Sequence, residues 1–240
     1  MSANAQKEFY NRASSFYANT CQNGNPYFAF VLNRFLSALG PLGGKDVLEM
    51  GCSLGRFTKP LLEQKCRLTG VDFSAQSLRG LDESLRTHPL RSNLEIVEDD
   101  VCNLSRIQSR VFNVICGAHI LHHVADVRAA LSRAHSLLVR GGRAVFLEPN
   151  PLNPLWYIQM VVEPTRAWEV ERGILNVRAA KVKEVFRAAG FVNCSVKSFG
   201  FFPPFAINGL PGLTRIEPVL ESAPFLARFA TLNLFVADKG

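Results

Sequence analysis

The sequence predicts an α/β protein whose parallel sheet is covered by helices on both faces. Short apolar runs, each long enough for one strand, alternate with amphipathic segments that have the spacing of helices. This alternation is typical of strand–helix–strand units, in which a connecting helix brings the chain back for parallel pairing. The expected strands are residues 46–50, 67–72, 94–98, 111–116, 143–148, 191–198 and 230–238. The expected helices are residues 55–64, 75–86, 125–139 and 179–189.

The bulk composition is that of an ordinary globular domain. A length of 240 residues fits a single domain with a sizeable core. Apolar residues make up 48% of the chain and charged residues 20%. The net charge of +7 is spread along the chain without a block of five like charges. This spread favours a solvated surface over a nucleic-acid interface, although composition alone leaves polyanion binding open.

The six cysteines form no C-x-x-C pair, and several lie in apolar runs where buried free thiols are common. We therefore expect a reducing compartment, and neither a disulfide framework nor a zinc site. The first residues lack the shape of a signal peptide, and no run reaches the ~18–20 uncharged apolar residues of a spanning helix. The simplest prediction is a cytoplasmic protein.

Three stretches lie outside the strand–helix alternation. Residues 1–44 carry aromatic residues in segments that read as helices and end in a glycine–proline cluster. Residues 149–178 and 199–229 each follow an expected strand. Because ligands of open α/β sheets bind beyond the carboxyl ends of the strands, both insertions are placed to shape a substrate pocket. With the core at residues 45–148 they are expected to form one domain, residues 1–240.

The most informative segment links the strand at residues 46–50 to the following helix. Glu49 lies near the end of the strand, and the small residues Gly51, Ser53 and Gly55 follow at every second position. Small side chains here let the backbone approach a ligand closely. A dinucleotide fold would carry G-x-G-x-x-G at this point to hold a pyrophosphate, which a nearby carboxylate would repel. The turn therefore suits a cationic, amine-bearing ligand.

The order of the motifs resembles a class I S-adenosylmethionine-dependent methyltransferase of the small-molecule type, over about residues 9–198 and the last strand. The first motif departs from the family in Ser53, which replaces the usual middle glycine. The resemblance implies a Rossmann-like fold with seven strands, mostly parallel, an antiparallel last strand and an N-terminal helical lid. It also implies S-adenosylmethionine as the cofactor and S-adenosylhomocysteine as the product. The implied cofactor contacts of the first motif are Glu49, Gly51, Cys52, Ser53 and Gly55.

A second implied cofactor contact lies at the end of the next strand. Asp72 follows Gly55 by 17 residues, close to where the family's acid receives the two ribose hydroxyl groups, and Phe73 adjoins it. The alternative is that Asp72 and Ser74 only cap the following helix.

The third and fourth implied contacts follow the next two strands. Asp100 matches the acid that meets the adenine amino group, and Val101 offers its backbone N–H to the ring. Asp99 would take this part if the register slipped by one residue, and an acidic surface turn is the alternative. Gly117 and Ala118 would bring their carbonyl groups towards the amino group of the cofactor.

At the N-terminus, Tyr17 is the implied lid residue that would meet the methionine carboxylate, with plain helix packing as its alternative.

Three histidines, His119, His122 and His123, follow the fourth strand. Their spacing invites a metal hypothesis, but no partnering acid cluster is evident and the family has metal-free members with the same histidines, so no metal is expected. His123 is the candidate general base or acceptor-orienting group, with packing as the alternative. Glu148 ends the fifth strand and is expected either to face the acceptor or to hold the turn at residues 149–151.

The insertions favour a small lipophilic or aromatic acceptor, because they offer an apolar mouth to the pocket. Its expected members are Leu155, Trp156, Phe199, Phe201, Phe202 and Phe205. Alternatively, these side chains only cover the edge of the sheet, or the phenylalanines contact a membrane surface transiently.

The sequence fits three other function classes less well. A methyltransferase acting on RNA or protein would need a contiguous basic face, which the sequence does not indicate. A nicotinamide oxidoreductase would need G-x-G-x-x-G, which residues 51–56 do not supply. A non-catalytic scaffold protein would have lost the acids at positions 49, 72 and 100, which are present. The atom that is methylated and the oligomeric state have no signature in the sequence.

Overall fold

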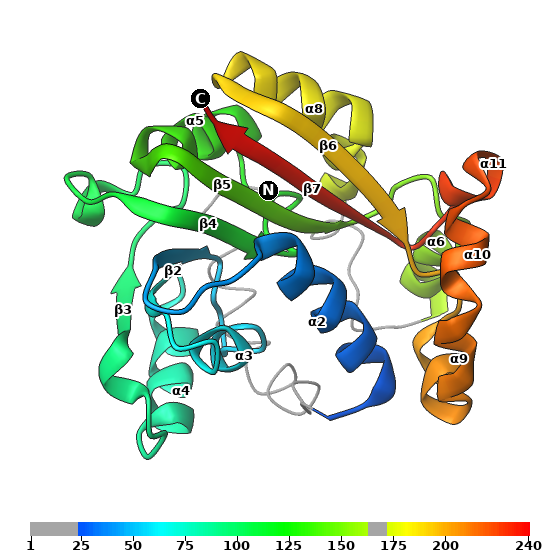
Figure 1. The fold of residues 1–240 in the computed structure, drawn as a ribbon, viewed down its shortest axis with the longest axis horizontal. Coiled ribbons are helices and arrows are strands. Elements are labelled where there is room, and N and C mark those ends of the chain that lie inside the picture. The colour runs from blue at the N-terminus through cyan, green and yellow to red at the C-terminus, as the bar shows by residue number, and fades with distance from the viewer. Residues whose placement is uncertain (1–23, 163–171) are drawn as a thin grey trace.

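The computed structural model describes residues 24–162 and 172–240, and its centre is a seven-stranded sheet (Figure 1). The strands lie side by side in the order β3-β2-β1-β4-β5-β7-β6. β7 runs antiparallel to both of its neighbours, and the pairs among β1–β5 are parallel. The strands are β1 Asp46–Met50, β2 Arg67–Asp72, β3 Leu94–Glu98, β4 Phe112–Ala118, β5 Leu138–Pro149, β6 Phe191–Phe199 and β7 Leu232–Lys239. The predicted Rossmann-like fold with an antiparallel last strand is confirmed.

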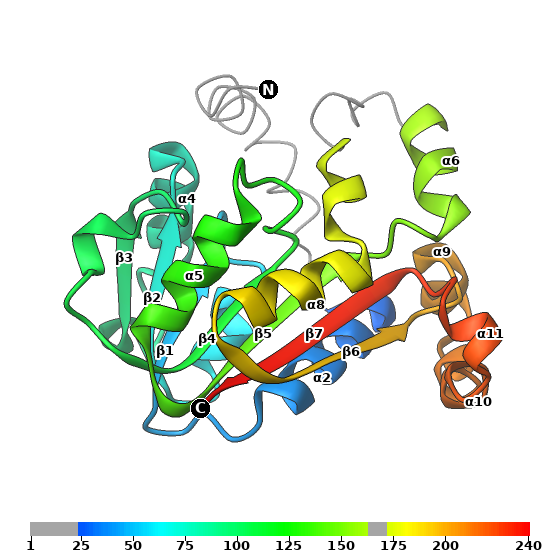
Figure 2. The same cartoon turned by 90° about the horizontal axis from the view of Figure 1, so that it is seen from above.

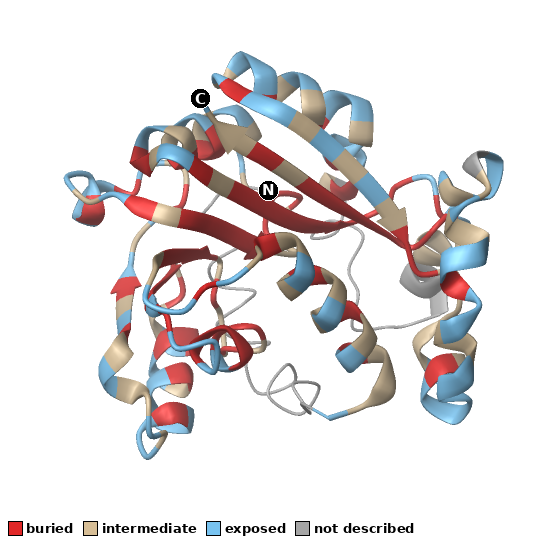
Figure 3. Ribbon diagram, viewed as in Figure 1, coloured by how far each residue is buried: buried red, intermediate tan, exposed pale blue. Residues whose placement is uncertain are grey.

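Helices cover both faces of this sheet (Figure 2). One face packs against α2 (Pro26–Leu39), α3 (Thr58–Leu62) and α4 (Ala75–Leu85), and the other packs against α5 (Val127–Leu137) and α8 (Ala179–Ala188). Successive strand residues serve the two cores in turn, as Val145 and Phe146 of β5 do. Figure 3 shows the central strands almost entirely buried, as expected for a sheet covered on both faces. Two short 3-10 helices, η1 (Arg91–Asn93) and η2 (Ser105–Ile107), flank β3.

α2 belongs to the core of the domain. Its N-terminus is capped by Asn25, whose side chain accepts a hydrogen bond from Phe28 N at 2.7 Å. Phe28 and Phe35 pack edge-on against Phe57, with ring centroids 5.4 and 5.2 Å apart. The described part of the lid predicted for residues 1–44 is therefore a core helix.

The helix predicted for residues 55–64 is shorter in the structure, where α3 spans Thr58–Leu62. Gly51, Ser53 and Gly55 all have positive φ angles, which keep the chain in a turn beyond the expected start of the helix. The turn is thus longer than helix propensity alone predicts.

The strand predicted for residues 143–148 starts earlier, because β5 begins at Leu138 directly after α5. The pairing with β4 shifts register between Phe112 and Val114, whose partners are Leu138 and Arg143. Gly141 and Gly142 therefore lie in an irregularity within the strand.

The described parts of both insertions contain short helices. After β5 come α6 (Pro154–Val162) and η3 (Arg172–Val177), and between β6 and β7 come α9 (Pro204–Gly209), η4 (Pro211–Arg215), α10 (Glu217–Glu221) and α11 (Pro224–Ala227). Figure 1 shows α9, α10 and α11 stacked as a column at one end of the molecule. The column is attached to α2, since Tyr27 N donates to Asn208 Oδ1 at 3.0 Å and Arg34 pairs with Glu221 at 2.7 Å.

A buried acid anchors the start of this column. The Glu217 side chain is inaccessible and accepts hydrogen bonds from Phe201 N at 2.9 and 3.0 Å and from Phe202 N at 3.3 Å. Phe199 is fully buried and packs against Phe30 of α2 at a centroid distance of 5.7 Å. For Phe199, the alternative that it covers the sheet is therefore correct, and this residue does not line an acceptor pocket.

The five cysteines within the described residues are free, and Cys52, Cys66 and Cys116 are buried. Burial raises the pKa of Cys66 to about 11, so this thiol stays protonated at neutral pH. In residues 24–162 and 172–240, no helix has the length and apolar character that crossing a bilayer requires. The cytoplasmic location stays a prediction.

Candidate functional site

The chain adds its strands to one side of β1 as far as β3 and then to the other side from β4 onward. From β1 the next strands along the chain, β2 and β3, lie to one side, whereas β4 and β5 lie to the other. In doubly wound sheets, ligands bind at this point, beyond the carboxyl ends of the strands. The candidate site is therefore the edge formed by the carboxyl ends of β1, β2, β3 and β4.

The turn after β1 has a left-handed backbone at three positions. The φ angle is +76° at Gly51, +46° at Ser53 and +89° at Gly55. A Cβ atom at Gly55 would lie 2.4 Å from Leu81 Cδ1, so this glycine also lets α4 pack closely. Ser53 adopts its conformation at a cost of about 1 kcal/mol or more, and its N–H donates to Asp72 Oδ2 at 3.0 Å. The serine that replaces the family's glycine thus fits the turn.

Asp72 at the end of β2 holds two turns in place. The residue is 6% exposed, and its two oxygens accept from Ser53 N at 3.0 Å and from Ser74 N at 2.9 Å. Ser74 itself caps α4, because its Oγ accepts from Ser77 N at 3.2 Å. A carboxylate has about four acceptor positions, so these bonds are compatible with the predicted ribose contact. That contact, and the one predicted for Phe73, stay predictions.

The acids after β3 divide into a structural one and an exposed one. Asp99 accepts from Asp100 N at 2.8 Å and from Arg106 N at 2.7 Å, which engages both of its oxygens at the start of η2. Asp100 is exposed, and its Oδ1 accepts from Cys102 N at 2.8 Å. This geometry supports Asp100 over Asp99 as the acid directed outward, beside the buried Val101. Their contacts with adenine stay predictions.

Glu49 lies behind the turn after β1. The residue is 3% exposed, and its Oε2 accepts a hydrogen bond from Thr58 Oγ1 at 2.7 Å. Burial raises the pKa of Glu49 to about 8, and the negative charge of Asp72 adds to this effect. Burial also raises the pKa of the neighbouring Cys52. A cation bound close by would favour the charged form of Glu49.

The turns after β1 and β4 pack together through a single side chain. A Cβ atom at Gly117 would lie 2.7 Å from Ile120 Cγ2 and 3.0 Å from Met50 O. A Cβ atom at Gly51 would lie 2.7 Å from Ile120 Cδ1. Ile120 therefore needs both glycines, and it brings the segment at Gly117 and Ala118 beside the glycine turn. The cofactor contacts of Gly117 and Ala118 stay predictions.

The loop after β4 is held by Glu148 at the end of β5. The Glu148 side chain is inaccessible, and its Oε1 accepts from Ile120 N at 3.0 Å and from Leu121 N at 2.7 Å. Its Oε2 lies 2.6 Å from His122 Nδ1. One carboxyl group thus engages three backbone N–H groups, the third being His122 N at 3.4 Å, and an imidazole ring. Sequence reasoning missed this cluster, because the partners are 26 to 28 residues apart and no motif links them.

This position differs from both roles predicted for Glu148. Its carboxyl group is directed into the protein towards residues 120–122, where it satisfies buried N–H groups, so it does not face an acceptor directly. The turn at residues 149–151 is held instead by Asn150. The Asn150 amide donates to the carbonyl oxygens of Arg228 and Ala230, both at 2.8 Å, and accepts from Leu152 N at 3.1 Å.

The histidine loop lies between the glycine turn and the first insertion. The rings of His122 and His123 have centroids 3.8 Å apart, and His123 N donates to Ile120 O at 2.9 Å. Gly173 of η3 approaches so closely that a Cβ atom there would lie 1.8 Å from His122 O. His123 is therefore part of a loop that contacts the glycine turn through Ile120 and η3 through His122. The catalytic role of His123 stays a prediction.

A polar row that sequence reasoning missed crosses the last three strands. Glu148, Asn233 and Ser198 occupy facing positions on β5, β7 and β6. Ser198 Oγ donates to Asn233 Oδ1 at 2.7 Å. Asn233 is 1% exposed, and its amide nitrogen has no hydrogen-bond partner among the described residues. The sequence feature that could have predicted this row is Asn233 inside an apolar strand, because a buried amide group needs a hydrogen-bond partner.

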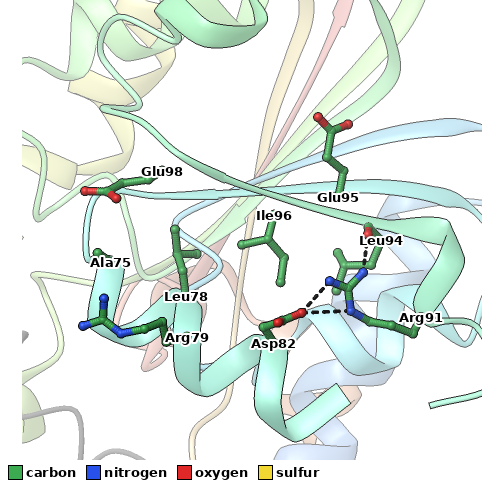
Figure 4. Close-up of a pocket in the computed structure, with 9 residues that line it drawn as sticks. All are labelled: Ala75, Leu78, Arg79, Asp82, Arg91, Leu94, Glu95, Ile96 and Glu98. Carbon is green, nitrogen blue, oxygen red and sulfur yellow. Dashed lines mark hydrogen bonds and ion pairs between the residues drawn. The ribbon is translucent and has the colours of Figure 1, made fainter. Parts of the chain in front are cut away.

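A surface hollow lies along α4 and β3, and Ala75 and Glu98 are among its lining residues (Figure 4). Its lining carries both signs of charge, and Arg91 pairs with Asp82 across it. None of the predicted site residues lines it.

Two predicted features remain to be placed. Tyr17 lies outside the described residues. Within the described ranges, no cluster of three or more histidine, cysteine, aspartate or glutamate residues is arranged to hold a metal ion.

Comparison with known proteins gives the same family as the motifs. Residues 48–144 match the model of a methyltransferase domain. Over 127 residues the chain is 31% identical to an uncharacterized methyltransferase of Mycobacterium tuberculosis, and the match covers 51% of this chain and 61% of that protein. Over 168 residues it is 28% identical to a ubiquinone biosynthesis O-methyltransferase of Idiomarina loihiensis, with 68% of each chain covered.

The fold has solved counterparts along its whole length. The magnesium protoporphyrin IX methyltransferase of Synechocystis PCC 6803, solved with bound SAH, superposes with a TM-score of 0.67 at 15% identity and full coverage of both chains. At that identity the likeness concerns the fold alone. Strand order, the glycine turn and the matched domain agree with one another, and the chain is similar to the class I S-adenosylmethionine-dependent methyltransferases.

Proposed function

We propose that this chain transfers a methyl group from S-adenosylmethionine to a small, lipophilic or aromatic acceptor by in-line displacement. The observation that most directly supports this proposal is the arrangement of residues at the carboxyl ends of the strands. The glycine turn, Asp72 and Asp100 follow β1, β2 and β3, while both insertions follow β5 and β6 at the same edge. Two proteins with similar sequence or fold are named for ubiquinone biosynthesis and for magnesium protoporphyrin IX, which supports a small-molecule acceptor.

The residues present fit this cofactor by their chemistry. A nucleoside joined to a cationic amino acid needs acceptors for its ribose hydroxyls and its ammonium group, and an apolar surround for its base. Asp72 would receive the hydroxyls, Asp100 and Val101 would hold the adenine, and the carbonyls of Gly117 and Ala118 would receive the ammonium group. Glu49 would add negative charge behind the turn.

When bound, the cofactor supplies an activated methyl group, so the protein need only align the acceptor and exclude water. His123 would take the acceptor's proton where the acceptor must lose one. Glu148 and His122 act as positioning residues, because they fix the loop that carries His123. Turnover that survives His123→Ala would leave alignment as the whole contribution of this loop.

The acceptor class also draws support from the first insertion. Leu152 and Ile158, which follow β5, are 51% and 55% exposed. An apolar acceptor would match these side chains.

Calorimetric titration of S-adenosylmethionine and S-adenosylhomocysteine into the purified protein tests the proposal, with a nicotinamide dinucleotide as control. We expect binding of the first two alone, followed by turnover with apolar acceptors in a screen. Failure of both to bind, in protein stripped of carried-over ligand, would refute the proposal and favour a non-catalytic role. Binding with turnover only of RNA or protein would refute the acceptor class and leave the cofactor assignment intact.

A further inference from the structure

The second insertion buries its acidic side chains and exposes many of its apolar ones. Residues 203–229 carry seven large apolar side chains that are exposed to solvent by 38% to 79%. These are Phe205, Leu210, Ile216, Val219, Phe225, Leu226 and Phe229. They lie on the short helices α9, α10 and α11 and the turns between them, which form the column in Figure 1. Exposed apolar side chains gathered in one segment of this kind mark an interaction surface.

The acids of the same segment point inward. Glu217 is inaccessible, and its carboxyl group is bound to the backbone of Phe201 and Phe202. The Glu221 side chain is 6% exposed and is neutralised by Arg34 and Lys197. These are the only two acids of the segment, so none is left at its surface.

The bases of the segment, in contrast, are exposed. Arg215 and Arg228 are both accessible to solvent. The Arg228 guanidinium lies over the rings of Phe225 and Phe229, 4.5 and 4.7 Å from their centroids. The surface therefore combines apolar side chains with positive charge only.

We propose that residues 203–229 form a docking surface for an anionic lipid bilayer. Phenylalanine and leucine side chains would enter the interface between head groups and acyl chains, and the two arginines would meet lipid phosphates. The column is held on the domain by the bonds of Asn208 and Glu221 to α2, so it presents a fixed platform. It follows β6, at the same edge of the sheet as the cofactor turn, so docking would bring the acceptor side to the membrane.

A second copy of the chain fits this surface less well. A two-fold dimer places the same surface on both partners. Here that would oppose the arginines of one copy to those of the other, with no exposed acid of this segment to pair with them. An anionic bilayer provides the missing negative charge.

Flotation of the purified full-length protein with vesicles tests the proposal. The vesicles are phosphatidylcholine alone or phosphatidylcholine with about 30% phosphatidylglycerol, at low and high salt. We expect binding to the anionic vesicles that falls as salt is raised. The double variant Phe205→Ser/Phe225→Ser should bind about 100-fold more weakly, at about tenfold per buried ring. Arg215→Glu/Arg228→Glu should bind at least about 25-fold more weakly, at about fivefold for each positive charge removed. The two added negative charges should weaken binding further.

Matched controls change the same chemistry elsewhere on the surface. Val111→Ser/Val192→Ser removes side chains that are 60% and 44% exposed, and Arg128→Glu/Arg140→Glu makes the same change of net charge. Both controls should bind vesicles like the unaltered protein. Because all these positions are exposed, thermal melting of every variant should stay unchanged.

Three results would overturn the proposal. The first is that the unaltered protein does not bind anionic vesicles, and the second is that the control variants lose as much binding as the test variants. The third is a protein that binds no vesicles but forms a concentration-dependent dimer, which only Phe205→Ser/Phe225→Ser abolishes. The proposal stands apart from the acceptor class. A protein that floats with vesicles but methylates a water-soluble acceptor would refute the acceptor class alone.

Discussion

Around the glycine turn, the polar contacts join residues that are close in the chain. Thr58 bonds to Glu49 across 9 residues, and Ser53 bonds to Asp72 across 19. In the insertion between β6 and β7 the corresponding contacts span the molecule, since Tyr27 bonds to Asn208 across 181 residues and Arg34 to Glu221 across 187. Local sequence therefore determines much of the proposed cofactor side around the glycine turn, whereas the proposed acceptor side, formed by the insertions, depends on helices from the opposite end of the chain. Separate substitutions should affect the two sides separately.

Substitution of Glu148 should give the largest loss of stability, because this residue holds the loop that lies between the two sides. Glu148→Ala leaves Ile120 N, Leu121 N and His122 Nδ1 without their buried acceptor, so we expect a loss of about 3–5 kcal/mol in the free energy of unfolding. Urea denaturation measures this loss. Glu184→Ala, an exposed acid on α8, should change stability by less than about 0.5 kcal/mol. A loss for Glu148→Ala no larger than for this control would show that the cluster does not hold the loop.

On the acceptor side, Glu217→Ala removes the acceptor of Phe201 N and Phe202 N. We expect a loss of about 2–3 kcal/mol in stability and a higher KM for the acceptor, because the column loses its anchor. Cofactor affinity, measured by calorimetry, should not change. A drop in cofactor affinity equal to the rise in KM would show that the two sides are one cooperative unit.

On the cofactor side, Asp72→Ala should have the opposite signature. Loss of the ribose acceptor should weaken cofactor binding by about 30–150-fold, which corresponds to about 2–3 kcal/mol. Asp82→Ala serves as control, since that side chain is 54% exposed and lies on α4 away from the turn. Unchanged affinity in Asp72→Ala would remove this residue from the cofactor site.

The same contrast explains how far sequence reasoning reached. Strand and helix positions follow from hydrophobic periodicity, and the turn after β1 follows from small residues at positions that need positive φ. The fold class and the order of the site segments were therefore predictable. The role of Glu148 was not, because its partners come from the loop after another strand and their N–H groups carry no side-chain signal.

The insertions show the same limit. Phe199 and Phe205 look alike in the sequence, yet one is fully buried and the other is 79% exposed. The difference arises from packing against α2, about 170 residues away, which no local pattern encodes. Composition alone does not show which of these side chains face outward.

The pKa values of the buried acids Glu49 and Glu217 provide a further comparison of the two sides. Burial raises the pKa of Glu49 to about 8, although one hydroxyl bonds to it, and burial raises the pKa of Glu217 against the opposing effect of backbone N–H groups. A raised pKa means that the folded protein keeps a proton which the unfolded chain releases above its ordinary value of 4.5. Stability should therefore fall as pH rises from about 4.5 to 8, because the folded protein keeps the Glu49 proton over this range.

Glu49→Gln isolates this contribution, because glutamine cannot ionise. The difference in free energy of unfolding between Glu49→Gln and the unaltered protein should grow as pH rises from 5 to 8, and urea denaturation at several pH values measures it. Cofactor binding should lower the pKa of Glu49, since an ammonium group nearby favours its charged form, so binding near pH 7 should release a proton in the unaltered protein but not in Glu49→Gln. Calorimetry in buffers of different ionisation enthalpy detects that proton. Equal proton release in both proteins would place the ammonium group away from Glu49 and assign its recognition to the segment after β4.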